Sequence, residues 1–250
     1  MHRLEVFPKR EGTLLFAHRG LHTKERENTI ASFSAAKENN VDGIELDVHL
    51  TLDNALVVIH DFNTKRTTGI DAVVETKTLK ELKEIDSEIP TLSEVFNAFG
   101  SSLLYDIEIK CPLLKKSNIE SVLWRTIDSS GLKDNILVSS FDPFALNRFQ
   151  HISKSDLPLA IIYDIDKGIP KIARKGAGRF LFRPSLLKPG LNTAAHDLKK
   201  RRLPISVWCV DTQQEAEKYI SMGARILISN RVDLLRGTVQ CKQQQLYHNE

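Results

Sequence analysis

Residues 43–61 read GIELDVHLTLDNALVVIHD, and this stretch decides the fold that we expect for the chain. Polar and aliphatic side chains alternate through residues 43–50, which predicts a β-strand because side chains two residues apart share a face. Glu45, Asp47 and His49 should therefore point to one side of that strand and the aliphatic residues to the other. Two carboxylates on one buried face need a cation beside them, because a buried unpaired charge is costly.

A short turn at residues 51–54 separates this strand from a second apolar run at residues 55–59. A connection of this length permits only an antiparallel return. The return brings His60 and Asp61 back beside Glu45 and Asp47, so one hairpin can gather two carboxylates and an imidazole. Taken alone, the same stretch is also compatible with a half-solvated strand that carries a surface histidine.

Length and composition restrict the classes of protein to consider. A chain of 250 residues that is 41% hydrophobic and 27% charged is typical of a soluble globular protein and fits one large α/β barrel or two small domains. We expect no transmembrane segment, because no apolar run approaches the roughly 20 residues that span a bilayer. A net charge of +3 is too small to indicate a nucleic-acid partner.

The cysteines and the N-terminal residues indicate the cellular compartment in which we expect the protein. Three cysteines form an odd, sparse set without the spacing of a metal site, which is typical of a reducing compartment. The first residues, MHRLEVFPKREG, lack the apolar core of a secretion signal. We therefore expect a cytoplasmic protein, and the sequence leaves its oligomeric state open.

Strand-like and helix-like segments alternate along the chain. The expected strands are residues 14–17, 43–50, 103–109, 136–140, 159–163, 179–182, 205–210 and 225–229. Helices are expected at about 29–39, 91–99, 117–131, from 142, 169–175, 193–201, 212–223 and, briefly, from 233. Such alternation favours parallel strands with right-handed crossovers.

Eight strand–helix units in about 235 residues fit an α/β fold of the (β/α)8 TIM-barrel type. The barrel would carry the hairpin and a small insertion, at about 61–90, after its second strand. We expect a single domain over residues 1–250 with a loose polar tail at about 237–250. A doubly wound open sheet is the alternative architecture.

Local signals at helix starts support these boundaries. Asn28 is the expected N-cap of the helix at 29–39. The segments TLSE at 91–94 and SNIE at 117–120 have the pattern of capping boxes.

Polar side chains collect where the expected strands end. In a barrel the carboxyl ends of the strands form one mouth, where catalytic groups lie. Three carboxylates, Glu45, Asp47 and Glu108, would converge there and repel one another unless a cation joins them. Ligands that are all oxygen suit Mg²⁺ or Ca²⁺ better than Zn²⁺.

Cations and histidines should lie at the same mouth. Arg19 and Lys110 suit a phosphate ligand, because both carry donors for its oxygens. His18 follows the first strand and the hairpin returns His60. Two histidines beside a metal and a phosphate are the parts of general acid–base chemistry on a phosphoester.

Short motifs along the chain resemble those of glycerophosphodiester phosphodiesterases. They are HRG at 18–20, ENT at 27–29, ELD at 45–47, HD at 60–61, RTTG at 66–69, IPTLSEV at 89–95, IEIK at 107–110, SSF at 139–141 and VWCVD at 207–211. Each motif is weak alone, but they occur in the family's order from about residue 14 to residue 235.

The resemblance implies a metal-dependent barrel enzyme that hydrolyses glycerophosphodiesters to sn-glycerol 3-phosphate and an alcohol such as choline or ethanolamine. It implies one divalent cation, Mg²⁺ or Ca²⁺, as cofactor and a small-molecule substrate as partner. The implied roles are Glu45, Asp47 and Glu108 as metal ligands, His18 and His60 as the acid–base pair, Arg19 and Lys110 as phosphate contacts, Trp208 as an aromatic near the glycerol, and Glu27 as support for the metal shell.

Two segments depart from the family pattern. The family usually has Thr-Asp and then a proline after the last strand, where this chain has Asn230 and Val232. The family's Trp-Thr-Val-Asn appears here as Trp208-Cys-Val-Asp211. These departures lie outside the expected metal ligands, histidines and phosphate contacts. They therefore affect the expected barrel-closing loop and substrate contacts more than the expected reaction.

Several alternatives stay open at this stage. His49 shares the face of Glu45 and Asp47 and is a candidate fourth ligand, unless the strand carries it past the mouth. A lysophospholipase D-like enzyme acting on lipids is the first alternative function, although the excursion at 61–90 is polar and contains one phenylalanine, Phe62. A non-catalytic barrel that binds glycerol phosphates is the second.

Overall fold

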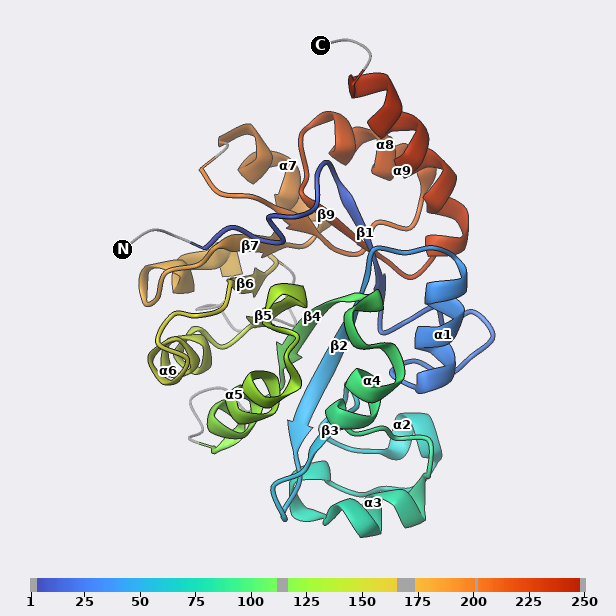
Figure 1. Cartoon of the computed structure of the whole chain (residues 1–250), viewed down its shortest axis with the longest axis vertical. Coiled ribbons are helices and arrows are strands. Elements are labelled where there is room, and N and C mark those ends of the chain that lie inside the picture. The colour runs from blue at the N-terminus through green and yellow to red at the C-terminus, as the bar shows by residue number, and fades with distance from the viewer. Residues whose placement is uncertain (1–3, 112–116, 166–173, 201, 248–250) are drawn as a thin grey trace.

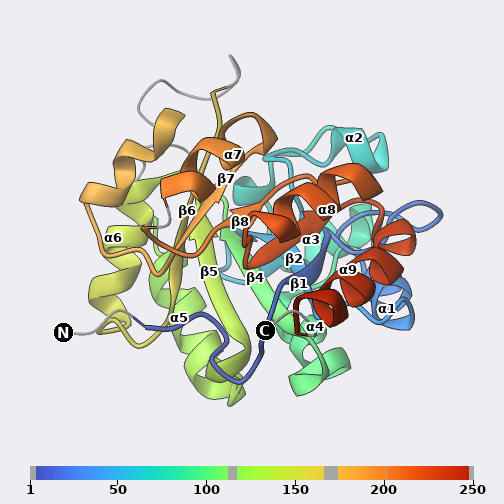
Figure 2. The same cartoon turned by 90° about the horizontal axis from the view of Figure 1, so that it is seen from above.

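The computed structural model describes residues 4–111, 117–165, 174–200 and 202–247. Within these residues eight parallel strands form a nearly closed barrel (Figures 1 and 2). Around the barrel the strands are β1 (Leu14–His18), β2 (Gly43–Leu50), β4 (Leu104–Ile109), β5 (Ile136–Ser140), β6 (Leu159–Tyr163), β7 (Leu186–Pro189), β8 (Ser206–Val207) and β9 (Ile226–Ser229). β9 pairs with β1, and single bridges from Leu187 to Ile205 and from Gly190 to Trp208 join β7 to β8. The predicted (β/α)8 fold is confirmed.

Helices surround the strands, as the view from above shows (Figure 2). They are α1 (Ile30–Glu38), α4 (Leu92–Phe99), α5 (Ile119–Ser130), α6 (Pro143–Ile152), α7 (Leu191–Lys200), α8 (Gln213–Ser221) and α9 (Val232–Tyr247). Each helix with an apolar stripe turns it toward the sheet; α4, for example, buries Leu92, Val95, Phe96 and Phe99. No helix among the described residues combines the length and the apolarity needed to cross a membrane.

The barrel interior has an apolar lower part, and this part positions the site above it. Inward residues near the amino ends of the strands, among them Phe16, Leu104 and Leu137, form a cluster that Phe7 covers from the N-terminal segment. Gly43 leaves space for Phe16, because a Cβ there would lie 2.6 Å from the Phe16 ring. Inward residues further along the same strands are polar, so the interior changes from apolar to charged toward the carboxyl ends.

The expected hairpin and insertion follow β2. β3 (Leu56–Val58) returns antiparallel to β2, with Val48 opposite Val58. The insertion contains α2 (Lys65–Thr68), a 3₁₀ turn at Val74–Thr76 and α3 (Leu79–Ile85), which extend beyond the barrel at the bottom of Figure 1. It has an apolar cluster of its own around Val74 and Leu82.

Three predicted elements differ from the structure. The strand expected at 179–182 was wrong: residues 174–180 form a 3₁₀ segment, and the barrel strand lies at Leu186–Pro189. The helix expected at 169–175 falls largely outside the described residues. The last helix is longer than expected, because α9 continues to Tyr247 through the segment that we expected to be loose.

Two of the predicted helix caps were also wrong. Thr29, not Asn28, caps α1, and its hydroxyl accepts from the backbone of Ser32. Asn28 has a positive φ of 58° and directs its amide into the barrel. At α5 the expected capping box is absent, because Glu120 turns inward to Arg148, with an N–O distance of 2.5 Å. The box at Thr91 is confirmed.

Candidate active site

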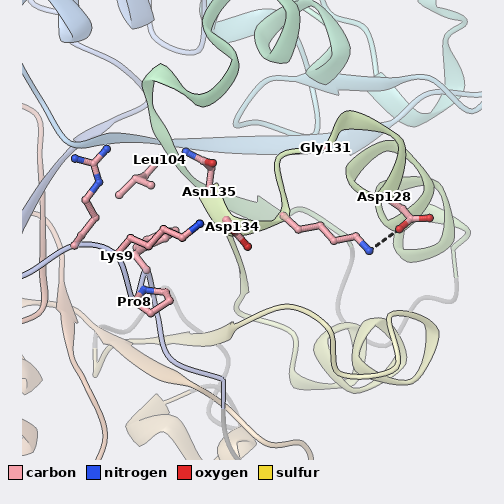
Figure 3. Close-up of a pocket in the computed structure, with 10 residues that line it drawn as sticks. Pro8, Lys9, Leu104, Asp128, Gly131, Asp134 and Asn135 are labelled. Carbon is pink, nitrogen blue, oxygen red and sulfur yellow. Dashed lines mark hydrogen bonds and ion pairs between the residues drawn. The ribbon is translucent and has the colours of Figure 1, made fainter.

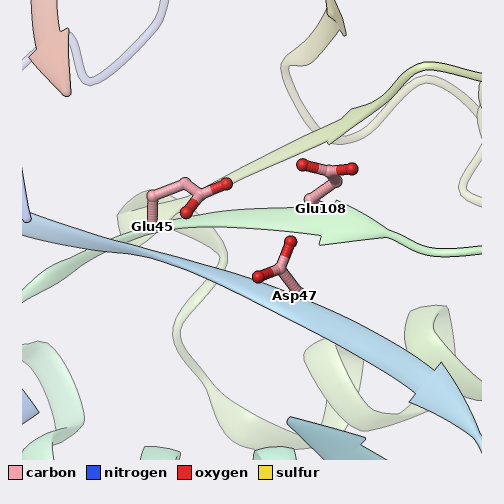
Figure 4. Close-up of side chains that lie close together, drawn as sticks. All are labelled: Glu45, Asp47 and Glu108. Atoms are coloured by element: carbon pink, nitrogen blue, oxygen red, sulfur yellow. The ribbon is translucent and has the colours of Figure 1, made fainter. Parts of the chain in front are cut away.

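Three carboxylates converge at the carboxyl ends of β2 and β4. These strands are parallel neighbours with Asp47 opposite Glu108, so inward-pointing residues of the two strands meet. Glu45, Asp47 and Glu108 are all buried, and one oxygen of each lies within 4.8 Å of the others. Figure 4 shows the three side chains gathered on the same side of the two strands.

Two cations and one amide compensate part of this charge. Lys110 Nζ lies 2.5 Å from Glu108 and 3.1 Å from Asp47. Arg19 Nε lies 3.4 Å from Asp47, and the Asn28 amide donates to the same carboxylate at 2.8 Å. Burial acts to raise the pKa of Asp47, but Lys110 and Arg19 outweigh it and hold that pKa well below its usual range.

The cluster keeps an excess of negative charge. Burial, assisted by the charges of Asp47 and Glu45, raises the pKa of Glu108 to about 7 against the opposing effect of Lys110. Glu45 Oε2 is buried and has no hydrogen-bond partner among the described residues. Its neighbour is His18 Nε2 at 3.8 Å. Three converging carboxylates, with Glu45 Oε2 and Asp47 Oδ1 left without a hydrogen bond among the described residues, fit a hard divalent cation, which takes oxygen ligands.

Sequence reasoning missed Lys188, a buried lysine in the barrel interior. Its Nζ lies 3.2 Å from Glu45 and 2.9 Å from Asp106. Burial opposes its charge, but Asp106 and Glu45 outweigh burial and raise the pKa of Lys188. Residues 186–189 were not assigned to a strand from the sequence, so Lys188 had no place in the expected barrel. A strand at these residues would have made Lys188 an inward-pointing candidate site residue.

His18 ends β1 and turns its ring into the mouth. Its Nδ1 lies 2.7 Å from Oδ1 of Asn230, and because an amide oxygen only accepts, Nδ1 carries the proton. His22 Nε2 lies 3.2 Å from the same oxygen. Burial, with Arg19, lowers the pKa of His18 in spite of Glu45. The unprotonated Nε2 therefore faces the carboxylates.

His60 belongs to a chain of ionic contacts that leads back to Arg19. Its Nδ1 lies 2.6 Å from Asp61, and Arg66 Nε donates to the other oxygen of Asp61 at 2.6 Å. Arg66 also donates to Glu27 at 2.6 Å, and Glu27 accepts from Arg19 at 3.1 Å. The structure thus places Glu27 between two arginines and not within the carboxylate cluster.

His49, the candidate fourth ligand, lies away from the three carboxylates. Its Nε2 is 3.2 Å from the backbone oxygen of His60, and its ring packs edge-on against Phe62 with 4.8 Å between centroids. Burial lowers the pKa of His49 to about 4. The strand carries the imidazole past the mouth and into the hairpin.

A cavity of about 300 Å³ joins these groups. Its charged side contains both histidines, Arg19, Lys110 and two of the carboxylates. Phe141, Ile162 and Trp208 line the opposite side together with Asp164 and Lys188. Trp208 packs edge-on against Phe141 at 5.8 Å, and its indole N–H donates to the backbone oxygen of Lys188 at 3.0 Å. The sequence-predicted Trp208 thus lies at the same cavity as both histidines.

A second cavity, of about 550 Å³, opens at the amino ends of the strands (Figure 3). Leu104 and Asn135 line it beside Lys133, which pairs with Asp128 at 2.6 Å. Its described lining contains no histidine and no group of converging carboxylates. In this barrel the acid–base groups therefore lie at the carboxyl ends of the strands.

These observations define a class of protein. A (β/α)8 barrel with carboxylates, two histidines and cations around one cavity at its mouth is a barrel enzyme with the groups for phosphoester chemistry. The model of the Glycerophosphoryl diester phosphodiesterase family matches residues 18–234. The chain belongs to this family and is a phosphoric diester hydrolase.

Individual relatives agree with the assignment to the family. A glycerophosphodiester phosphodiesterase of Caldanaerobacter subterraneus is 31% identical over 91% of this chain and 98% of its own length. The structure of a glycerophosphodiester phosphodiesterase from Thermotoga maritima has a TM-score of 0.70 at 27% identity, covering 89% of this chain and 96% of the other. An Oleispira antarctica phosphodiesterase, solved with the product sn-glycerol-3-phosphate, has a TM-score of 0.73 at 22% identity, covering 95% of this chain and 100% of the other.

Proposed function

We propose that the enzyme hydrolyses water-soluble glycerophosphodiesters, such as glycerophosphocholine and glycerophosphoethanolamine, with one divalent cation, Mg²⁺ or Ca²⁺. The products are sn-glycerol 3-phosphate and the free alcohol. The observation that carries the proposal is a cavity lined by both histidines, Arg19, Lys110 and two of the three converging carboxylates, with the third, Asp47, beside them. The Oleispira phosphodiesterase that shares the fold holds sn-glycerol-3-phosphate, which agrees with this choice of product.

The balance of buried charge supports the proposed ligands. Four buried carboxylates lie at the base of the cavity, namely Glu45, Asp47, Asp106 and Glu108, and a fifth, Asp164, lines its opposite side. Three cations contact them, and they are Arg19, Lys110 and Lys188. Carboxylates therefore outnumber cations at the site. A divalent cation would offset this excess of negative charge, and Arg19 and Lys110 would attract the singly charged phosphodiester.

Glu45, Asp47 and Glu108 would hold the cation, which when bound neutralises charge on a phosphate oxygen. Arg19 and Lys110 would orient the phosphate beside the cation, because both residues line the cavity and both carry donors for phosphate oxygens. Lys110 already bridges two of the carboxylates. It therefore ties the position of the phosphate to that of the metal ligands.

His18 and His60 would move the protons. Each has Nδ1 held by a neighbouring side chain, Asn230 for His18 and Asp61 for His60, which leaves Nε2 for the substrate. One imidazole would remove a proton from the nucleophile, either water or the glycerol 2-hydroxyl, and the other would protonate the leaving alcohol. Phe141 and Trp208 would cover the glycerol carbons with their apolar rings.

The small cavity favours a soluble diester over a lysolipid. A volume of about 300 Å³ holds a glycerophosphate, whereas a long acyl chain would need an apolar groove that continues from it. A lysophospholipase D-like activity is therefore the first alternative function, and binding without catalysis is the second. The test distinguishes both from the proposed function.

The test uses purified protein stripped of metal with EDTA. Glycerophosphocholine and lysophosphatidylcholine are each added with Mg²⁺ or Ca²⁺, and glycerol 3-phosphate and choline are measured. We expect the added metal to restore release of glycerol 3-phosphate from the soluble diester. Turnover of the lysolipid alone would replace the proposal with the lipid-cleaving function. No turnover of either substrate by metal-loaded protein would leave the binding function.

A further inference from the structure

Lys188 reaches across the barrel interior to the metal-site strand. β7 and β2 are four strands apart in the ring of eight, so they face each other across the barrel. The Lys188 side chain is only 3% exposed, and its Nζ lies 3.2 Å from Glu45 Oε1 on the opposite strand. A buried lysine in this place needs a reason, because burial of an unpaired ammonium is costly.

Lys188 donates two hydrogen bonds and makes one further ion pair within the barrel. An ammonium has three N–H donors, and Nζ has three oxygen neighbours: Glu45 at 3.2 Å, Asp106 at 2.9 Å and the Ser139 hydroxyl at 3.3 Å. Ser139 in turn donates to Asp106 at 2.6 Å. Three oxygens of the protein therefore surround Nζ, so a role in binding the substrate directly does not follow from its lining of the cavity.

The two oxygens of Glu45 have different surroundings. Oε1 accepts from Lys188, whereas Oε2 is buried without a hydrogen-bond partner among the described residues and points toward His18. We infer that Lys188, anchored by Asp106, is a positioning residue that fixes Glu45 by Oε1 so that Oε2 is presented to the divalent cation. This inference rests on the metal site of the proposed function.

Asp106 makes the arrangement possible without changing the charge of the site. Lys188 and Asp106 are opposite charges in contact, so the pair adds no net charge beside the carboxylate cluster. Removing both together therefore leaves the attraction between the site and a cation unchanged to first order. The contact that holds Glu45 is lost, together with the hydrogen bond from Lys188 to Ser139.

The test is the double variant Lys188→Met/Asp106→Asn, with Mg²⁺ and Ca²⁺ binding measured by calorimetry and by the rise of the melting temperature on metal addition. The asparagine avoids leaving the Asp106 carboxylate buried without its lysine, so we expect the variant to fold. Its metal dissociation constant should rise roughly 10- to 100-fold, the usual effect of losing a residue that orients a metal ligand. At saturating metal the KM for the diester should stay near that of the wild type.

A matched control is the variant Glu120→Gln/Arg148→Met. It removes another ion pair, between buried Glu120 on α5 and half-buried Arg148 on α6, and should leave metal affinity unchanged. Wild-type metal affinity in the Lys188→Met/Asp106→Asn variant would overturn the inference. So would an unchanged affinity with a raised KM, because Lys188 would then contact the phosphate.

The binding measurement also separates this inference from the proposed function. Wild-type protein that binds metal but cleaves no diester would contradict the proposed reaction and leave the role of Lys188 standing. If the wild-type enzyme is active and the double variant binds metal with normal affinity, the proposed reaction stands and the role of Lys188 is contradicted.

Discussion

Asn230 donates two hydrogen bonds to Asp211, one from its side-chain amide to Oδ2 and one from its backbone N–H to Oδ1, both at 2.8 Å. Both residues are among the positions at which the sequence departs from the family pattern. The family usually has an asparagine at the position of Asp211 and an acidic residue at the position of Asn230, so this chain has the two groups exchanged. One carboxylate and one amide remain in contact, and the two departures compensate each other.

This exchange predicts strong coupling between the two positions. Asn230→Asp alone places two carboxylates together and should lower the free energy of unfolding by about 2 kcal/mol. Asp211→Asn alone removes the acceptor that carries the charge. The double exchange Asp211→Asn/Asn230→Asp restores one carboxylate and one amide, so its stability should return to within about 0.5 kcal/mol of the wild type. Urea unfolding of the four proteins measures the coupling.

If the effects of Asn230→Asp and Asp211→Asn on the free energy of unfolding are additive, the contact between residues 211 and 230 does not stabilise this part of the barrel. A useful control is Asn118→Asp, since Asn118 makes no side-chain cap at α5 and its change should not depend on residue 211.

The two histidines of the cavity should each be needed for catalysis. His18→Ala and His60→Ala should each lower kcat by roughly 10²-fold or more, the usual contribution of a general acid or base. Metal affinity should change much less, because the expected metal ligands are the three carboxylates and neither histidine is one of them. His151→Ala, an exposed residue at the end of α6, serves as the control. Near-wild-type kcat in either catalytic variant would remove that histidine from the mechanism.

The cysteines should differ sharply in reactivity. Burial, together with Asp142 for Cys111 and Asp211 for Cys209, raises the pKa of each of these thiols to about 12. At about pH 8 only about 10⁻⁴ of such a thiol is thiolate, the form that reacts. Cys241 is exposed. Mass spectrometry after iodoacetamide treatment should show one alkylated cysteine in native protein and three after denaturation. Rapid modification of Cys209 in native protein would contradict this account of its surroundings.

The sequence predicted the barrel because its signals are local and repeated. Alternation on β2 and the alternating strands and helices depend on nearest neighbours, and they placed Glu45, Asp47 and Glu108 on inward faces correctly. The error at 179–182 arose where a four-residue strand, Leu186–Pro189, contains a lysine and a proline. Both residues argue against a buried strand, so local propensity favoured the wrong segment.

The missed parts of the site depend on contacts between distant segments. Lys188 is buried because carboxylates on β2 and β4 compensate its charge, which no local pattern reveals. Glu27 was expected near the metal, but Arg66 from the insertion draws it into a different contact. Asn28 resembled a helix cap because its amide suits that role, whereas the structure uses the amide to hold Asp47.

Arg66 should affect catalysis, although from the sequence residues 66–69 were only a family motif and Arg66 had no expected role. It contacts Asp61, the partner of His60, and Glu27, the partner of Arg19. Removing it takes one partner from each of these carboxylates, so the imidazole of His60 and the guanidinium of Arg19 lose support together. We expect Arg66→Met to lower kcat/KM by about 10-fold or more, the usual size of an effect on orientation, with little change in metal affinity.

Lys65→Met is the matched control for Arg66→Met. Lys65 is the preceding residue, has the same charge and pairs with exposed Asp71 outside the site, so its loss should leave kcat/KM near the wild-type value. Equal losses in the two variants would mean that general charge on the insertion attracts the anionic substrate, an effect that salt would screen. A loss confined to Arg66→Met, and insensitive to salt, would establish that the insertion completes the active site by fixing His60 and Arg19.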